Sequence, residues 1–409
     1  MSIEDTIKEI IKKIMNDPSL KQRYDFAKSH VDTAPFVGSF SWDTAVYWNP
    51  LISVLKESKK YEKFNHKYQH IASSAYLVRI EDLANWLINK SKEFGIDKTI
   101  KILNEYNESE KMILYVIKTI FSLQFKGEYS FSNGVIINSG GFNKKFANEL
   151  FLHRINSSIP NPDVSIIFAF PIEKEILHTD VLTDKERSAD KERSADEEYL
   201  LGLEKINHAK ECLILSRGLN GVHTIAHKYI IPDNIPLVST ARGDSWSLET
   251  FYLPTRTSPF ITLDELNEAN RILTIFVTLD DKIRKRIQVS IQRLNGYCSS
   301  SDIIERAVNI RTCLESIFME ENEEVSISST IALRASRLLE DTLVKRKEKY
   351  KLIKTAYNIT SLAVHRGLIN TKKMKDISIL DEVAEVARQV ILLKIENREE
   401  FSWKDIELS

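Results

Sequence analysis

Apolar residues recur at helical spacing along the first 120 residues of the chain. Ile7, Ile10, Ile11 and Ile14 follow the i, i+3, i+4, i+7 pattern of one buried helix face. Residues 80–94 and 110–123 repeat that period. We therefore predict a helical N-terminal domain over residues 1–144.

The period changes near residue 128. Residues 129–138 have the pattern of a β-hairpin, in which Asn133-Gly134 would supply the positive φ angles of a two-residue turn. Four further runs are typical of strands, at residues 164–170, 211–215, 228–231 and 248–253. The sequence thus predicts a small α+β middle region over residues 145–261.

A strongly charged stretch interrupts this middle region. The six-residue unit Asp184–Ala189 is followed at once by an identical copy at Asp190–Ala195, and few apolar residues occur near it. Such a stretch buries too little surface to offset its ordering entropy. We predict a solvated charged loop over residues 183–198, or a short exposed helix.

The helical period returns at Thr262 and continues to the end of the chain. Asp302, or Ser301 before it, has the side chain of a helix N-cap. Short connections between amphipathic helices predict an antiparallel helical bundle over residues 262–409. The predicted helices cover residues 263–279, 280–297, 302–318, 328–344, 350–364 and 379–395. The fold class is therefore mainly α.

Composition limits the kinds of partner that the chain can have. A formal net charge of −1 excludes a uniformly basic nucleic-acid binder, so any RNA site must be a local patch. Three scattered cysteines fit a reducing cytosol, and no run approaches the roughly 18 apolar residues of a membrane span. We predict a cytoplasmic protein that does not associate with a membrane and binds no cofactor.

Three segments of the last third resemble one known family. Residues 302–318, 331–339 and 357–367, in that order, are similar to the ApeA-like HEPN domain. The resemblance extends over residues 262–409 and does not include the first 260 residues. It implies a helical bundle that dimerises and cuts RNA without a metal, as a regulated effector in antiphage or abortive-infection defence.

In that family an Arg lies four to six residues before a His, and both protomers contribute to the site. A neutral imidazole exchanges protons with the ribose 2′-hydroxyl and the leaving oxygen, while a guanidinium stabilises charge on the phosphate. His365 matches the His of the motif, but Thr360 stands where the Arg is expected. Asn358 and Ser361 share the His365 face of the helix.

Several residues are candidates for the missing cation. Arg366 could act across a dimer axis, Arg311 or Arg337 could project from neighbouring helices, or another chain could donate an Arg. For Arg311 the alternative is a structural i, i+4 ion pair with Glu315.

Basic residues cluster at two places that would suit an RNA backbone. The alternative is that both clusters are solvated helix faces. The candidates are Arg284, Lys285, Arg286, Lys345, Arg346 and Lys347.

Two His pairs have the i, i+4 spacing of a helical metal site. They are His66 with His70 and His223 with His227, and neither has the Glu of the His-Glu-x-x-His motif or a matched third ligand. We therefore predict no metal site.

Three hypotheses follow for the whole chain. The first is an RNA endonuclease in which residues 1–261 sense a trigger, such as a protein regulator, or restrain the nuclease. The second is a catalytically degenerate HEPN module that dimerises and binds RNA or protein. The third is a structural helical scaffold.

Overall fold

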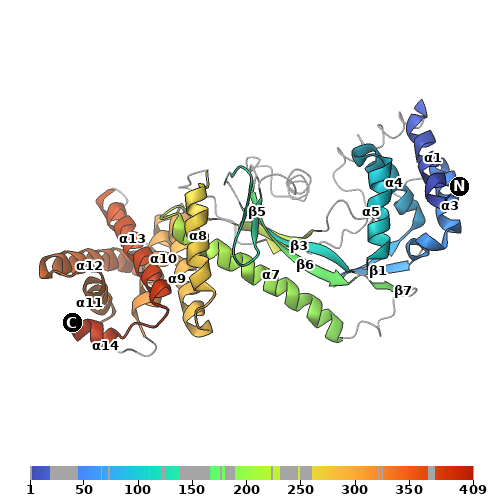
Figure 1. Cartoon of the computed structure of the whole chain (residues 1–409). Helices are drawn as coiled ribbons and strands as arrows, with labels where there is room; N and C mark the ends of the chain where they lie inside the picture. Colours follow the sequence, from blue (N-terminus) through green and yellow to red (C-terminus); the bar gives the residue numbers. More distant parts are fainter. Residues whose placement is uncertain are drawn as a thin grey trace. The chain divides into compact units, whose positions relative to one another are not determined.

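A computed structural model of the chain is mainly helical (Figure 1). The chain divides into two compact units, of which the first is Met1–Val116, Pro171–Gly202 and Lys228–Trp246, and the second is Ile117–Phe170, Leu203–His227 and Ser247–Ser409. At some positions, among them His365 and Arg366, only the backbone is described. The structure describes residues 2–18, 45–65, 67–71, 74–109, 111–120, 123, 125–138, 166–175, 177–179, 189–222, 224–230, 247–248, 260–320, 323, 326–366 and 374–408.

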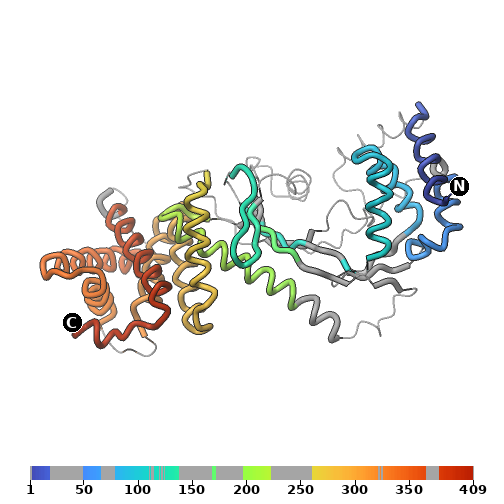
Figure 2. The backbone as a smooth tube through the Cα atoms, in the orientation of Figure 1, coloured from blue at the N-terminus to red at the C-terminus, as the bar shows by residue number. Residues whose placement is uncertain are grey.

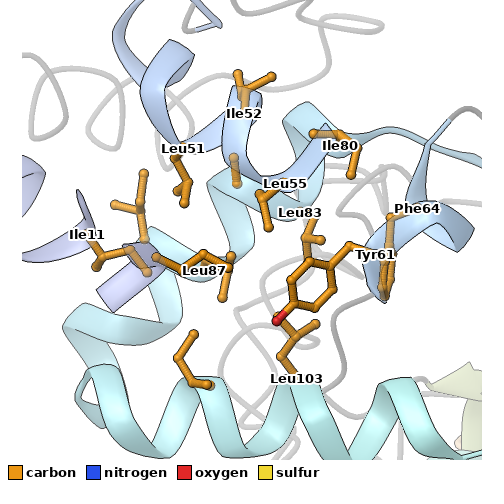
Figure 3. Close-up of a cluster of buried hydrophobic side chains, with 14 of the residues drawn as sticks. Ile11, Leu51, Ile52, Leu55, Tyr61, Phe64, Ile80, Leu83, Leu87 and Leu103 are labelled. Carbon is orange, nitrogen blue, oxygen red and sulfur yellow. The ribbon is translucent and has the colours of Figure 1, made fainter. Parts of the chain in front are cut away.

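The N-terminal helices enclose a hydrophobic core, which Figure 3 shows in close-up. Helix α1 begins with a capping box, because Ser2 and Asp5 bond to each other's backbone N–H. Its predicted stripe is buried at Ile7, Ile11 and Ile14. The elements are α1 (Ile3–Asn16), α3 (Ala45–Glu57), η1 (Lys59–Phe64), α4 (Ile80–Phe94) and α5 (Ile96–Glu108).

Two sheets accompany the helices. The three-stranded sheet has the order β2-β1-β7 and is antiparallel, with β1 at Lys67–Ile71, β2 at Ser74–Val78 and β7 at Leu177–Thr179. The six-stranded sheet has the order β4-β5-β6-β3-β8-β9. Its strands are β3 (Lys111–Ile120), β4 (Glu128–Ser130), β5 (Ile136–Asn138), β6 (Ile166–Glu175), β8 (Thr224–Ile230) and β9 (Ser247–Leu248).

The prediction of a helix over residues 110–123 is wrong, because residues 111–120 of this segment form strand β3. Its neighbours in the sheet are β6 and β8. Val116, Ile117 and Lys118 are buried in succession, as in a strand that is covered on both faces. A short apolar run of this kind cannot be distinguished from a helix by period alone. Strands β1 and β2 likewise interrupt the region that was predicted to be helical.

The predicted strand at residues 211–215 is also wrong, because these residues end a long helix, α7 (Ala189–Ser216). The second copy of the charged repeat, Asp190–Ala195, lies in the same helix, so from residue 189 onward the segment follows the helical alternative and not the loop, although the helix is long and not short. Residues 183–188 lie outside the described part of the chain. Strands β6, β8 and β9 overlap the other predicted strands.

The predicted hairpin is confirmed, but its turn differs from the prediction. Gly134 has φ +85°, whereas Asn133 does not have a positive φ. The Phe131 N–H donates to the Val135 carbonyl at 2.8 Å and the Gly134 N–H to the Phe131 carbonyl at 3.0 Å. The connection is therefore a longer turn in which only the glycine adopts the left-handed conformation.

Helices fill the C-terminal part of the second unit (Figure 2). Asp302 caps α10 by accepting from the Ile304 N–H at 2.8 Å, as predicted. Contacts near both ends make α9 and α10 antiparallel, and the same holds for α11 and α12. The helices are α8 (Leu263–Phe276), α9 (Asp281–Ser299), α10 (Ile303–Phe318), α11 (Ile327–Leu339), α12 (Leu343–Arg366), α13 (Met374–Asn397) and α14 (Trp403–Leu408). Among the residues described, no helix has both the length and the apolar character needed to cross a membrane.

The second half of α7 belongs to the same compact unit as α8 to α14. The His208 ring packs edge-on against Phe276 of α8, and Arg388 of α13 donates to the Leu215 carbonyl at 2.9 Å. Its apolar face is buried at Ile206, Ala209, Cys212, Leu213, Ile214 and Leu215. The predicted bundle boundary at residue 262 therefore omits a packed helix.

One carboxylate is buried where α7 meets α9. Glu211 is 2% exposed and accepts a hydrogen bond from the Gln288 amide at 3.1 Å. Burial raises the pKa of Glu211 to about 7, although Gln288, Lys210, Gln292 and Lys118 all favour the carboxylate. From pH 4.5 to about 7 the folded state therefore holds a proton that the unfolded state has released. Stability falls as the pH rises through that window.

Replacement of Glu211 by Gln is expected to stabilise the protein at pH 8 by about 1–3 kcal/mol and to leave stability at pH 4.5 nearly unchanged. The reason is that the amide keeps an acceptor for Gln288 without a charge. Thermal unfolding of both proteins between pH 4.5 and 8 measures this difference. Glu197→Gln, at an exposed position of the same helix, is the control. Equal gains for the two variants at pH 8 would contradict the assignment.

Candidate functional site

Near its C-terminal end, helix α12 has one buried face and one face that is more exposed and carries the apolar Leu362 besides polar residues. Ile353, Ala356 and Ala363 are buried against the bundle, whereas Asn358 is exposed and Ser361 is half-buried. His365 lies in the last turn of the helix. By the helical period its position falls on the face of Asn358 and Ser361, away from the core.

Thr360 occupies the position where the resemblance calls for an arginine. Its side chain is fully buried, and its hydroxyl donates to the Tyr357 carbonyl at 2.9 Å. An arginine here would place a guanidinium in the core of the bundle, which is strongly unfavourable without a partner. A cation for this site must therefore come from another position.

Arg311 of α10 is held at the contact with α12. Its Nε lies 2.9 Å from Glu315 Oε1, so the ion pair weighed as the structural alternative is present. Its guanidinium stacks over the Tyr357 ring at 4.8 Å, and the Tyr357 hydroxyl donates to the same Glu315 oxygen at 2.6 Å. Burial raises the pKa of Tyr357, with the neighbouring carboxylate as a further cause.

These contacts keep Arg311 away from His365 within one protomer. Tyr357 lies eight residues before His365, which corresponds to about 12 Å along the helix axis. The Arg311 Nη1 is buried without a hydrogen-bond partner. In this arrangement Arg311 joins α10 to α12.

Arg337 lies still farther from His365. The Arg346 guanidinium donates to the Glu340 carbonyl at 2.7 Å, which places the end of α11 beside the start of α12. His365 is 19 residues beyond Arg346, or about 28 Å along the axis. Of the three arginines considered, this leaves Arg366, which follows His365 and is turned about 100° around the helix from it.

The first basic cluster is largely engaged in structural contacts. Arg284 and Lys285 both pair with Asp281 at 2.7 Å, in the first turn of α9. Arg286 donates to the carbonyls of Ser316 and Met319, at the C-terminal end of α10. A cation suits that end of a helix because the last carbonyls carry partial negative charge.

The second basic cluster lies at the start of α12. Lys345 and Lys347 are exposed, and among the described residues neither forms an ion pair. Arg346 is held by the Glu340 carbonyl. Lys345 is 20 residues from His365, so about 30 Å of helix separates this cluster from the candidate site.

A further charged cluster was missed in the sequence. Arg334 of α11, Lys394 of α13 and Trp403 of α14 are almost fully buried and lie close together. Arg334 and its partner Glu407 are 73 residues apart, so no local spacing relates them. The only sign of this cluster in the sequence was a pair of aromatic residues, Phe401 and Trp403, within a charged segment.

Neither His pair lies on a helix at the positions that are described. His70 belongs to strand β1 and His227 to strand β8, while His66 and His223 lie outside the described residues. Residues i and i+4 of a strand are too far apart for one ion. The described residues contain no group of three side chains suited to hold a metal.

Comparison with known proteins gives no match. No protein-family model matches the chain, and neither the curated proteins nor the solved structures contain a significant relative. A functional assignment therefore depends on the chemistry of the chain itself and on the resemblance carried by residues 302–318, 331–339 and 357–367.

Proposed function

We propose that the chain is a HEPN-type RNA endonuclease that needs no metal and acts in the cytoplasm as a regulated effector of antiphage or abortive-infection defence. The observation that carries the proposal is the position of His365, at the end of α12 and on the same face as the exposed Asn358. The resemblance of residues 357–367 to the HEPN motif supplies the reaction class.

The reaction requires one proton acceptor and one fixed cation. The ribose 2′-hydroxyl attacks the adjacent phosphorus while an imidazole accepts its proton. The bond from phosphorus to the 5′-oxygen of the next nucleotide breaks, and the imidazolium returns the proton to that oxygen. The products are a 2′,3′-cyclic phosphate and a 5′-hydroxyl. Arg366 of a second protomer stabilises the charge on the phosphate, because the position of Arg366 on the same helix is turned about 100° from that of His365. Asn358 and Ser361 offer hydrogen bonds to the RNA.

A second candidate is a catalytically degenerate module that dimerises and binds RNA or protein. The burial of Thr360 favours it, because the helix carries no cation at the position that the family motif uses. The engagement of Arg311 with Glu315 favours it further. Under this hypothesis the surface of α12 binds without cutting.

Mixing of two inactive variants tests the composite site. His365→Ala and Arg366→Ala are each expected to lose RNA cleavage when pure. An equal mixture, allowed to exchange protomers, should recover about a quarter of wild-type activity, because half of the dimers are mixed and each has one complete site. Light scattering on the same samples establishes whether the dimer is present. A dimeric mixture that stays as inactive as its components would contradict the shared site.

A further inference from the structure

The last residues of the chain fold back over the C-terminal bundle. Residues 398–408, here called the C-terminal strap, begin at Arg398, which follows α13 and has a φ of +59°. Trp403 anchors the strap, since its side chain is 2% exposed and its ring lies 5.5 Å from that of Phe318. Phe401 packs edge-on against Trp403 at 5.4 Å.

Three cations from three helices lie against the strap. Arg286 comes from α9, Arg334 from α11 and Lys394 from α13. We call them the cationic cluster. Arg334 and Lys394 have side chains that are only 5% exposed, which is unusual for such groups. Buried cations of this kind need anionic partners.

The strap supplies two of those partners. Glu407 Oε1 lies 2.6 Å from Arg334 Nε. Glu400 lies 3.5 Å from the Lys394 ammonium and 3.6 Å from the Arg286 guanidinium. The third partner, Glu323, is outside the strap and pairs with Arg334. Among the described residues, the strap thus makes three of the four ion pairs of this cluster, and its removal would leave only the pair of Arg334 with Glu323.

An aromatic ring sits within the same cluster. The Trp403 ring lies 5.2 Å from the Arg334 guanidinium and 5.5 Å from the Lys394 ammonium. With Phe318 at 5.5 Å, the indole is placed between an aromatic ring and two cations. Planar nucleobases bind in the same kind of surroundings, through stacking and cation–π contacts.

The strap has the features of a segment that can be displaced. Its helix, α14, has six residues, far fewer than an isolated helix needs in water. The Trp403 indole N–H is buried without a hydrogen-bond partner, which offsets part of its burial. The Glu400 ion pairs are long, and this carboxylate is 40% exposed.

We propose that the cationic cluster is a binding site for single-stranded RNA and that the strap closes it as an internal substitute for the ligand. The Glu400 and Glu407 carboxylates take the places of two phosphates, and the Trp403 indole takes the place of an unstacked base. RNA that enters the site lifts the strap. The choice of RNA as the ligand rests on the proposed function, whereas the site itself rests on the contacts above.

RNA fits these groups better than an acidic peptide does. Two anionic positions flank one planar ring, and a nucleotide chain repeats that arrangement of phosphate, base and phosphate. A guanidinium group can donate to two oxygens of one phosphate at once, and it also stacks on bases. An acidic peptide would reproduce the two anionic positions and the ring only if it had an aromatic residue placed like Trp403.

The test compares two double variants that remove the same charge from the same segment. Glu400→Gln with Glu407→Gln frees the cationic cluster. Glu399→Gln with Asp405→Asn is the control, because both residues are exposed and neither pairs with the cluster. All proteins span residues 1–409 and carry His365→Ala, so that cleavage cannot consume the probe. The probe is a fluorescent single-stranded RNA of mixed sequence.

The Glu400/Glu407 variant is expected to bind this RNA at least about tenfold more tightly than the parent, with affinity that falls steeply with salt. The control should stay within about twofold of the parent. Equal affinities for the two double variants would overturn the proposal. If the Glu400/Glu407 variant gains affinity for a poly-glutamate probe but not for RNA, the proposal is overturned in favour of an acidic protein partner.

A second measurement covers the case in which the Glu400/Glu407 variant fails to fold. Saturating RNA should speed amide hydrogen exchange at residues 401–408 of the otherwise unchanged His365→Ala protein, because the strap must leave before RNA occupies the site. Unchanged protection of these amides in the presence of bound RNA would overturn the proposal. If the Glu400/Glu407 variant binds RNA more tightly but the wild type cuts no RNA, the nuclease proposal is wrong and the RNA-binding site under the strap still stands.

Discussion

A fragment that begins at Thr262 is expected to lose the cooperative unfolding of the C-terminal unit, because it lacks the second half of α7. That half buries four large aliphatic side chains, Ile206, Leu213, Ile214 and Leu215. At about 1.5–3 kcal/mol for each of them that packs against the bundle, their loss removes a large share of the roughly 5–15 kcal/mol that stabilises a domain. The range for each side chain is an upper bound, since unfolded chains already bury some surface.

The same truncation also leaves polar groups of the bundle without their partners. Asn295 exchanges two hydrogen bonds with the backbone of Val222, at 2.9 and 3.0 Å. Arg388 loses the Leu215 carbonyl and Gln288 loses Glu211. Each loss adds to the destabilisation because partly buried donors and acceptors are left unsatisfied.

Calorimetry and binding of a hydrophobic dye compare fragments 262–409 and 203–409. The shorter fragment should bind dye at 25 °C and show no sharp transition, while the longer one melts at a higher temperature and binds less dye. Similar melting temperatures and similar dye binding for the two would contradict the assignment of α7 to this unit.

Local signals in the sequence were reliable where a helix has one buried face and clear ends. The predicted helix at residues 80–94 matches α4, and Asp302 caps α10. Both depend on interactions within a few residues. The pattern failed at β3 and at residues 211–215, where nearly every side chain is apolar and a helix and a buried strand have the same composition.

In the candidate site, too, the features that depend on local spacing were predicted and those that depend on tertiary packing were not. The ion pair of Arg311 with Glu315 follows from i, i+4 spacing and was foreseen. The burial of Thr360 was not, because the rotation of α12 is set by packing against other helices. The cationic cluster under the strap depends on residues from α9, α11, α13 and α14, so only the tertiary structure brings it together.

The His365 imidazole is expected to be indispensable for RNA cleavage. It is the only side chain on its face of α12 with an ordinary pKa near 7, so no neighbour can take over the proton transfer. His365→Ala should lower the cleavage rate by at least about a hundredfold while melting temperature and oligomeric state stay unchanged. Glu348→Ala, at an exposed position of the same helix, is the matched control.

RNA cleavage in the presence of EDTA, by wild type, His365→Ala and Glu348→Ala, tests the proposed function most directly. The assay is run with pure protein and with extract of phage-infected cells, because a restrained effector is silent without its trigger. Wild type and Glu348→Ala should release fragments with 2′,3′-cyclic phosphate ends, and His365→Ala should release none. Equal RNA cleavage by wild type and His365→Ala, or equal phage protection by the two in cells, would contradict the nuclease proposal. The alternative, a catalytically degenerate binding module, would then replace it.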